Sequence, residues 1–292
     1  MHTSKLILGT AQFGLDYGIN NSIGKVKEED IFSILDFSLA HGIDHIDTAS
    51  AYGNAEEVLG KYFTIRGNDA FKITTKFSFA QKTSLTECLH DSLHRLLVNA
   101  VDTILFHSYS DYKIYQNQLP DFIASNKNKY FKHIGVSVYT NEEIEGLLDD
   151  SNIDVVQVPY NLLDNNNIRG ELFSRLKSKG KTIHVRSVFL QGLFFMKPDA
   201  FPINLAALKE PVQALNNLCL EYNLDMRELA LSYIMHNPLI DGILMGIDSL
   251  DQLRHNIASV KEDLSEEIIN KIEAIAVSNK QLLNLSTWKI QK

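Results

Sequence analysis

One recurrence constrains the fold of this chain more than any other feature: a short apolar run followed by a stretch with helical spacing, repeated eight times. The runs lack the alternation of apolar and polar residues that marks a strand with one solvent-facing side. Strands that are apolar throughout are typical of parallel sheets, in which both faces are covered. The eight runs are Lys5–Gly9, Ile43–Asp47, Phe71–Thr75, Val101–Phe106, Phe131–Val136, Ile153–Val158, Thr182–Ser187 and Asp241–Met245.

Eight strand–helix units without a break in composition predict an α/β protein, and specifically a single (β/α)8 TIM barrel formed by residues 1–292 as one domain. Barrels of this kind usually contain about 250 residues, which suits the length of this chain. The alternative is an open, doubly wound sheet divided between two domains. The barrel is favoured because no linker rich in proline or serine separates two halves of the chain.

The stretches between the runs carry their own helix signals. Leucines recur three or four residues apart along one such stretch, which predicts an amphipathic helix: Leu85, Leu89, Leu93 and Leu96. Ser84 with Glu87, and Thr140 with Glu143, have the spacing of a capping box, so each pair is predicted to begin a helix.

Two segments depart from the simple alternation of strands and helices. The connection at 194–211 contains three prolines and predicts an ordered excursion over the barrel mouth, and two helical stretches at 212–222 and 227–236 follow it. The final segment, 281–292, carries the only tryptophan, Trp288. Two interpretations of this tail stay open: it folds over a pocket, or it is a surface staple or a frayed end.

Polar residues end three of the apolar runs. Asp47, Lys76 and His107 close the second, third and fourth runs, and Tyr52 follows five residues after Asp47. Barrel active sites lie at the carboxyl ends of the strands, so these side chains are predicted to converge. An ammonium beside a phenol favours the phenolate and lowers the phenol pKa, and an imidazole can orient a carbonyl oxygen. No side chain donates hydride, so carbonyl reduction at such a site requires a nicotinamide cofactor.

The same residues carry a family resemblance. Asp47-Thr48-Ala49, Tyr52-Gly53, Thr75-Lys76 and then His107 resemble the catalytic tetrad pattern of the aldo-keto reductase superfamily, and the likeness extends over nearly the whole chain. The resemblance implies a barrel that binds NADP(H) across its mouth and reduces an aldehyde or ketone. It also implies that Tyr52 is the general acid, that Lys76 and Asp47 tune it, and that His107 orients the carbonyl.

Further motifs resemble the cofactor-binding segments of the family. They lie at the first strand, Gly9-Thr10-Ala11, at Gly135-Val136-Ser137, at Val156 to Asn161 around Gln157, at Ser187 with Gln191-Gly192, and at Gly246 to Asn256. The residues that the resemblance assigns to the cofactor are Gly9, Thr10, Ala11, Asp47, Ser137, Gln157, Arg186, Ser187, Gln191, Gly192, Gly246, Ile247, Ser249, Gln252 and Asn256.

Three positions depart from the family pattern. Arg186 stands where the family often has an aromatic residue stacked on the nicotinamide, and its guanidinium either stacks on a ring or faces substrate or phosphate. Val138 replaces an asparagine. Asp248 falls in the loop where the family often places a cation, and a carboxylate there repels a 2′-phosphate. We expect NADP(H) from the habit of the family, with NAD(H) as the alternative.

The expected substrate is a small carbonyl compound in a pocket with aromatic walls. Four candidate wall residues are Phe13, Tyr109, Tyr160 and Phe189, and Tyr17 lies in a similar stretch. A start such as LGTAQFGLDYGI resembles a bacterial branch of the family that is associated with surface polysaccharides, which makes a sugar or nucleotide-sugar ketone a candidate. Two other functions stay open: a cofactor-sensing subunit with little turnover, and a lyase or isomerase without nicotinamide.

The composition narrows the partners and the compartment. A formal net charge of −8 argues against nucleic acid and anionic membranes as partners, and no apolar run approaches the ~20 residues that span a bilayer. The first residues have no signal-peptide pattern, and only Cys88 and Cys219 are present, so a cytoplasmic location is expected. His90 and His94 lack the glutamate of a zinc-protease motif, so no metal site is predicted.

Overall fold

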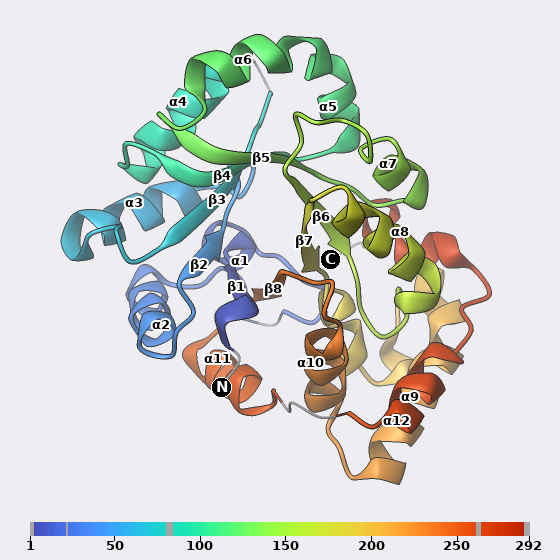
Figure 1. The fold of residues 1–292 in the computed structure, drawn as a ribbon. Coiled ribbons are helices and arrows are strands. Elements are labelled where there is room, and N and C mark those ends of the chain that lie inside the picture. The colour runs from blue at the N-terminus through green and yellow to red at the C-terminus, as the bar shows by residue number, and fades with distance from the viewer. Residues whose placement is uncertain (1–2, 22, 80–83, 261–263, 289–292) are drawn as a thin grey trace.

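A computed structural model describes residues 3–21, 23–79, 84–260 and 264–288, and these form a closed barrel of eight parallel strands (Figure 1). The strands pair in chain order, and the last pairs with the first to close the barrel. They are β1 (Leu6–Gly9), β2 (His45–Asp47), β3 (Lys72–Lys76), β4 (Val101–Phe106), β5 (Phe131–Ser137), β6 (Val155–Pro159), β7 (Thr182–Arg186) and β8 (Gly242–Gly246). The predicted barrel is confirmed, and each predicted run agrees with its strand to within two residues at either end.

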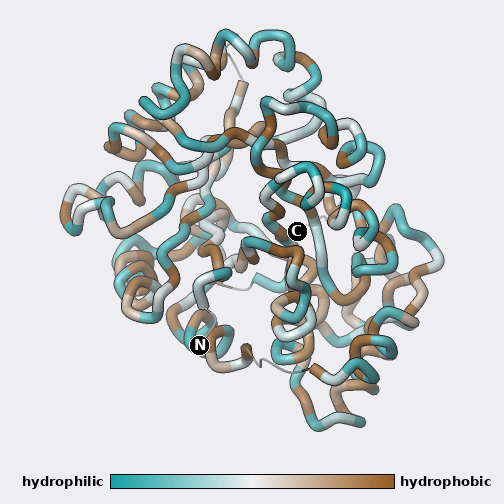
Figure 2. The backbone as a smooth tube through the Cα atoms, viewed as in Figure 1, coloured by the Kyte–Doolittle hydropathy of each residue, from teal (hydrophilic) through white to brown (hydrophobic). Residues whose placement is uncertain are grey.

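Helices surround the strands as an outer layer (Figure 1). In Figure 2 they alternate between hydrophilic and hydrophobic residues, as helices with one face on a core do. The α-helices are α1 (Ala11–Gly14), α2 (Glu28–Ala40), α3 (Ala55–Arg66), α4 (Leu85–Leu96), α5 (Tyr109–Tyr115), α6 (Leu119–Asn126), α7 (Asn141–Glu145), α8 (Asn166–Ser178), α9 (Lys209–Tyr222), α10 (Met226–His236), α11 (Leu250–Ala258) and α12 (Glu266–Glu273). Within the described ranges, no helix is long and apolar enough to cross a bilayer.

The predicted helix starts have different outcomes. Thr140 and Glu143 form the full capping box at α7, with the Thr140 hydroxyl accepting from the Glu143 N–H at 3.3 Å. Ser84 precedes α4, but its side chain makes no capping hydrogen bond with any described residue, so the capping box predicted there is wrong. Burial positions α4 instead, because all four leucines of its predicted apolar face are at most 7% exposed.

Three short 3₁₀ helices and two longer α-helices connect β7 to β8, and short 3₁₀ helices also form the last described segment of the chain. After β7 come the 3₁₀ helices η3 (Leu190–Phe195), η4 (Pro198–Ala200) and η5 (Ile203–Leu208), and the two predicted helices are α9 and α10. The other 3₁₀ helices are η1 (Thr3–Lys5), η2 (Gln116–Gln118), η6 (Lys280–Leu283) and η7 (Leu285–Thr287). The Trp288 indole N–H donates to the Leu282 carbonyl at 2.8 Å, and the ring packs on the core. Trp288 therefore holds the terminal segment against the rest of the protein.

A contact between two glycines joins the end of α1, which follows β1, to the loop that follows β2. Gly53 has φ of +54°, and a Cβ atom added to it would lie 2.3 Å from the Gly14 carbonyl oxygen. A Cβ atom added to Gly14 would lie 1.7 Å from the Tyr52 carbonyl oxygen. Neither position accommodates a side chain, and the contact fixes the backbone of Tyr52 immediately before α3.

Replacement of Gly53 by alanine tests this contact. We expect Gly53→Ala to lower the free energy of unfolding by roughly 2–5 kcal/mol, because a main-chain overlap adds to the cost of positive φ. Gly180→Ala is the matched control: Gly180 also has positive φ, +72°, but no atom lies within 4 Å of its added Cβ, so a loss of about 1–2 kcal/mol is expected. Urea unfolding followed by circular dichroism measures both, and equal losses would contradict the contact.

Candidate active site

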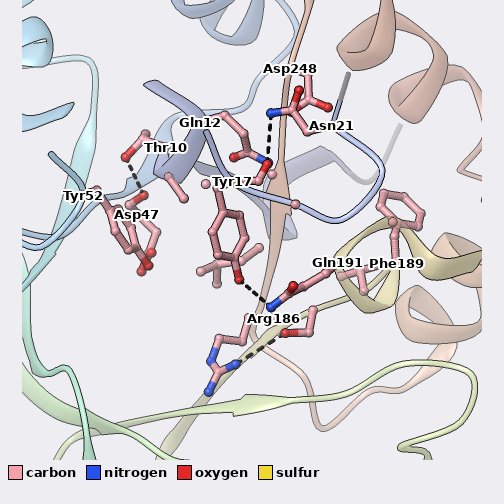
Figure 3. Close-up of a pocket in the computed structure, with 18 of the residues that line it drawn as sticks. Thr10, Gln12, Tyr17, Asn21, Asp47, Tyr52, Arg186, Phe189, Gln191 and Asp248 are labelled. Carbon is pink, nitrogen blue, oxygen red and sulfur yellow. Dashed lines mark hydrogen bonds between the residues drawn. The ribbon is translucent and has the colours of Figure 1, made fainter. Parts of the chain in front are cut away.

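The carboxyl ends of the strands open into a cavity of about 320 Å³ (Figure 3). All four predicted catalytic residues line it: Asp47 ends β2, Lys76 ends β3, and Tyr52 and His107 follow β2 and β4. Parallel strands present their carboxyl ends at the same edge, which is why residues 60 positions apart in sequence meet here. The convergence expected from the sequence is present in the structure.

A buried ion pair forms the floor of the cavity. The side chains of Lys76 and Asp47 are 1% and 2% exposed, and the Lys76 ammonium donates to Asp47 Oδ1 and, at 3.0 Å, to the Thr48 carbonyl. Gln157 Nε2 donates to the other carboxylate oxygen, Asp47 Oδ2, at 2.8 Å. Burial alone would lower the pKa of Lys76, but Asp47 and Tyr52 together outweigh it and raise that pKa. Lys76 is therefore an ammonium at neutral pH.

Tyr52 lies above this pair. The Lys76 ammonium is 5.1 Å from the centroid of the Tyr52 ring, and the His107 ring packs edge-on against it with centroids 5.6 Å apart. Burial raises the pKa of Tyr52 above its ordinary value, while Lys76 lowers it. The sequence-based expectation of a lowered phenol pKa is thus wrong in its net direction, because desolvation outweighs the ammonium. The phenol is protonated at neutral pH and available to donate a proton.

His107 faces the same point as a neutral ring. Burial, followed by the charge of Lys76, lowers the pKa of His107 to about 4. A neutral imidazole carries one N–H donor and one acceptor nitrogen. His107 can therefore donate a hydrogen bond to a carbonyl oxygen that lies beside Tyr52.

Arg186 at the end of β7 also lines the cavity (Figure 3). Its guanidinium lies over the Tyr139 ring, 4.2 Å from the ring centroid. Arg186 Nη2 donates to the Val138 carbonyl at 3.0 Å, and Nη1 approaches the Ser187 hydroxyl at 3.4 Å. Its positive charge lowers the pKa of both Tyr52 and His107, although burial dominates each.

Most of the predicted cofactor residues reach the cavity wall, and three do not. Those on the wall are Gly9, Thr10, Ala11, Asp47, Ser137, Gln157, Arg186, Ser187, Gln191, Gly192, Gly246 and Gln252. The three that do not reach the wall are Ile247, Ser249 and Asn256. Ile247 and Asn256 are fully buried, and Ser249 caps α11 by accepting from the Gln252 N–H at 3.2 Å. The Gln252 side chain accepts from the Asp248 N–H at 2.7 Å, one residue earlier than a standard capping box.

Unpartnered polar atoms mark the wall as a binding surface. Gln12 Oε1, Gln157 Oε1 and Asp248 Oδ1 are buried side-chain oxygens without a hydrogen-bond partner in the described chain, and all three residues line the cavity. Both side-chain polar atoms of Asn256 are also unpartnered. Native proteins leave few such atoms unsatisfied, so this pattern fits a polar ligand that lies along the wall from β6 to α11.

A bridge crosses one side of the cavity. Gln191 Nε2 donates to the Tyr17 hydroxyl at 3.1 Å, and the Ile19 N–H donates to the Gln191 carbonyl at 3.2 Å (Figure 3). The segment after β7 reaches this position through three non-glycine residues with positive φ, namely Ser187, Leu190 and Gln191. The excursion predicted at 194–211 contributes only Phe195 to the described cavity wall.

The predicted aromatic wall is corrected in part. Phe189 and Tyr17 line the cavity, whereas Phe13, Tyr109 and Tyr160 do not. Phe13 is fully buried in the core, Tyr160 stacks on Tyr233 with centroids 5.8 Å apart, and Tyr109 packs against Gly146. The sequence placed each of them near a strand end, but the side of the strand or turn on which a side chain emerges decides what it faces.

Several wall residues were not among the site residues predicted from the sequence: Gln12, Gly18, Asn20, Asn21, Tyr139, Val188, Phe195 and Leu244. Tyr139 was the most predictable of these residues from the sequence, because it follows Ser137, a predicted cofactor residue, by two positions. No group of three or more His, Cys, Asp or Glu side chains that could hold a metal ion is found among the described residues. The His90 ring packs edge-on against Tyr130, with centroids 4.9 Å apart.

Comparison with known proteins places this geometry in a family. Residues 5–277 match the profile of the Aldo/keto reductase family. L-galactose dehydrogenase of Arabidopsis thaliana is 25% identical, with 92% of this chain and 90% of that protein covered. NADH-specific methylglyoxal reductase of Escherichia coli is 23% identical over 77% and 81% of the two chains.

A solved structure shows the same fold. The holo form of an aldo-keto reductase from Bacillus halodurans superposes with a TM-score of 0.73 at 22% identity, covering 94% of this chain and 93% of that one. The family match spans the barrel and every strand that lines the cavity. This chain belongs to the aldo/keto reductase family and is an NAD(P)H-dependent oxidoreductase.

Proposed function

We propose that this enzyme, as a single domain of residues 1–292, reduces an aldehyde or ketone to the alcohol with Tyr52 as the general acid. The observation that carries the proposal is the position of the Tyr52 ring, whose centroid lies 5.1 Å from the Lys76 ammonium and 5.6 Å from the centroid of the His107 ring. Burial raises the pKa of the Tyr52 phenol, which keeps its proton available. The bound nicotinamide cofactor supplies the hydride. We expect a cytoplasmic enzyme that acts on a small molecule, without a nucleic-acid or membrane partner.

The chain's own residues handle the proton and the charge that develops on oxygen. A carbonyl oxygen placed between Tyr52 and His107 accepts a hydrogen bond from each, which orients the carbonyl group. As negative charge develops on that oxygen, the Tyr52 proton moves to it. The phenolate left on Tyr52 lies beside Lys76, whose charge stabilises it, and Asp47 holds Lys76 in place. General acid catalysis of this kind contributes about 10²–10⁴-fold.

The unpartnered wall atoms are the proposed cofactor contacts. Gln157 Oε1 can accept from an amide N–H near the tetrad, and Asp248 with Gln12 lies toward the β8 end of the wall. The resemblance to the family also assigns Ile247, Ser249 and Asn256, which lie in α11 or just before it, to the cofactor. Tyr17 and Phe189 offer aromatic faces on which a sugar ring can lie, so a sugar or nucleotide-sugar carbonyl remains the proposed substrate.

The first test removes the proton donor. Tyr52→Phe keeps the ring but not the hydroxyl, so kcat is expected to fall about 10²–10⁴-fold while the affinity for the cofactor changes little. Tyr112→Phe is the control, because Tyr112 donates its hydroxyl to Asp150 and does not line the cavity. Turnover on a carbonyl panel and cofactor fluorescence are measured together. Tight cofactor binding with no turnover by the wild-type chain would indicate a regulatory subunit instead.

The pH profile provides a second test. His107, with a pKa near 4, is neutral above about pH 5, and the raised pKa of Tyr52 keeps the phenol protonated past its ordinary value. We therefore expect kcat/KM for carbonyl reduction to stay level between about pH 5 and 9. A basic limb near pH 7 that disappears in Tyr52→Phe would show that Tyr52 ionises far below this expectation.

Asp248 is the residue proposed to decide between NADPH and NADH. Members of the family often use NADPH, yet the two cations on the described cavity wall are Lys76, which is paired with Asp47, and Arg186, which lies over Tyr139. Arg254 stacks on Phe37 and does not line that wall. Asp248→Lys is expected to raise the ratio of kcat/KM for NADPH over NADH by about tenfold or more, because a repulsive charge becomes attractive. Asp251→Lys is the control, because Asp251 is an exposed carboxylate that does not line the cavity wall. Steady-state rates with both cofactors measure the ratio, and an unchanged ratio would remove Asp248 from the 2′-phosphate site.

A further inference from the structure

Arg186 is a cation without a carboxylate partner in the described chain, and it stands on the wall of the reaction cavity. Four charged residues line that wall, and two of them, Asp47 and Lys76, neutralise each other. The remaining two are Asp248 and Arg186. Asp164 is close enough for Arg186 to influence its pKa, but both Asp164 oxygens already accept from Arg169 at 2.7 Å.

The guanidinium is held in place by neutral groups. The Tyr139 ring lies 4.2 Å from it, and the Val138 carbonyl accepts from Nη2 at 3.0 Å. Including the contact with the Ser187 hydroxyl, described residues occupy two of its five N–H donors. The other donors belong to a side chain that lines the cavity, where a planar anion can bind a guanidinium through two parallel hydrogen bonds.

Tyr139 is itself fixed at both of its backbone polar groups. Its N–H donates to Glu143 Oε2 at 2.6 Å, and its carbonyl accepts from Arg169 Nη2 at 2.8 Å. Arg169 is in turn bound by both oxygens of the buried Asp164. The platform beneath Arg186 is therefore rigid, which is what recognition of a ligand group by a preorganised donor requires.

Arg186 shares its cavity with the proposed reacting groups. Arg186, Tyr52 and His107 all line this cavity, and the charge of Arg186 contributes to lowering the pKa of Tyr52 and of His107. An anion bound at Arg186 would place the rest of a small molecule across the cavity toward the Tyr52 hydroxyl. The oxidised nicotinamide ring is cationic, so a guanidinium beside it is a poor partner for the cofactor ring and a better one for a negatively charged substrate.

We propose that Arg186 anchors an anionic group, a carboxylate or a phosphate, of the carbonyl substrate and so selects anionic aldehydes and ketones. This inference rests on the carbonyl reduction proposed above. An uncompensated, partly buried cation costs free energy in the free enzyme, and an anionic substrate offsets that cost when it binds. Selection by Arg186 adds to, and is separate from, proton donation by Tyr52.

Matched substrate pairs test the anchor. Succinic semialdehyde and butanal differ by a carboxylate, and glyceraldehyde 3-phosphate and glyceraldehyde differ by a phosphate. In the wild-type enzyme we expect kcat/KM to favour the anionic member, and Arg186→Gln to reduce that preference by about 10–100-fold, mainly through KM. Arg175→Gln removes an exposed guanidinium that is paired with Glu145 and should keep the preference.

The conservative variant distinguishes the two anions. Arg186→Lys keeps the charge but loses the planar fork, so it should restore more of the preference for phosphate than for carboxylate. If the wild-type enzyme prefers the anionic member over the neutral member in only one pair, Arg186 does not bind the anion of the other pair. If neither anionic member is preferred, or if Arg186→Gln lowers kcat/KM equally for charged and neutral members, the proposal is overturned.

A measurement without turnover separates this proposal from the proposed function. Phenylglyoxal modifies accessible arginines, and peptide mass spectrometry reports the extent at each site. With the oxidised cofactor bound, which cannot donate hydride to phenylglyoxal, succinate or inorganic phosphate should protect Arg186 and leave the modification of Arg175 unchanged. Protection without reduction of any carbonyl would support the anion site while rejecting the reductase function. Absence of protection by both anions would overturn the anion site whatever the turnover.

Discussion

The buried pair of Asp47 and Lys76 is the interaction on which the rest of this site depends. It joins the ends of β2 and β3, and Gln157 extends it across the barrel to β6. Removal of one partner would leave an uncompensated charge at a cost of about 3–5 kcal/mol. The same contact therefore ties strands together at the barrel mouth and places two opposite charges near Tyr52, of which Lys76 lowers and Asp47 raises the pKa of the phenol.

Burial divides the protonation states among the neighbouring groups. Lys76 stays charged because Asp47 is beside it, Tyr52 stays protonated because its phenol is desolvated, and His107 stays neutral for the same reason. Arg186 then adds a second positive charge near the reacting centre. In a chain with a net charge of −8, the four charged residues of the described cavity wall sum to zero, and Arg186 is the one cation among them without a carboxylate partner.

The strands, and the meeting of Asp47, Tyr52, Lys76 and His107 at one cavity, were predictable because both follow from the edge where the apolar runs end. Asp47, Lys76 and His107 each close such a run, and the barrel brings those ends together. The aromatic wall was less predictable, because a shift of one residue along a strand turns a side chain to the other face. Tyr160 therefore points into the core, while Tyr139, without a motif of its own, reaches the cavity. Neither the net pKa of Tyr52 nor the bridge from Tyr17 to Gln191 follows from local sequence, since both depend on contacts between distant loops.

The backbone contact between Gly14 and Gly53 makes the two rims of the cavity unequal. The rim formed by the first two loops is locked, because an insertion in either loop would push directly on Tyr52. The rim at η3 is joined to the first loop by hydrogen bonds, from Gln191 Nε2 to the Tyr17 hydroxyl and from the Ile19 N–H to the Gln191 carbonyl. The following turns η4 and η5 contribute no residue to the described cavity wall. New substrate range in relatives of this enzyme is therefore expected to arise by remodelling the connection between β7 and α9, while Tyr52 stays in register.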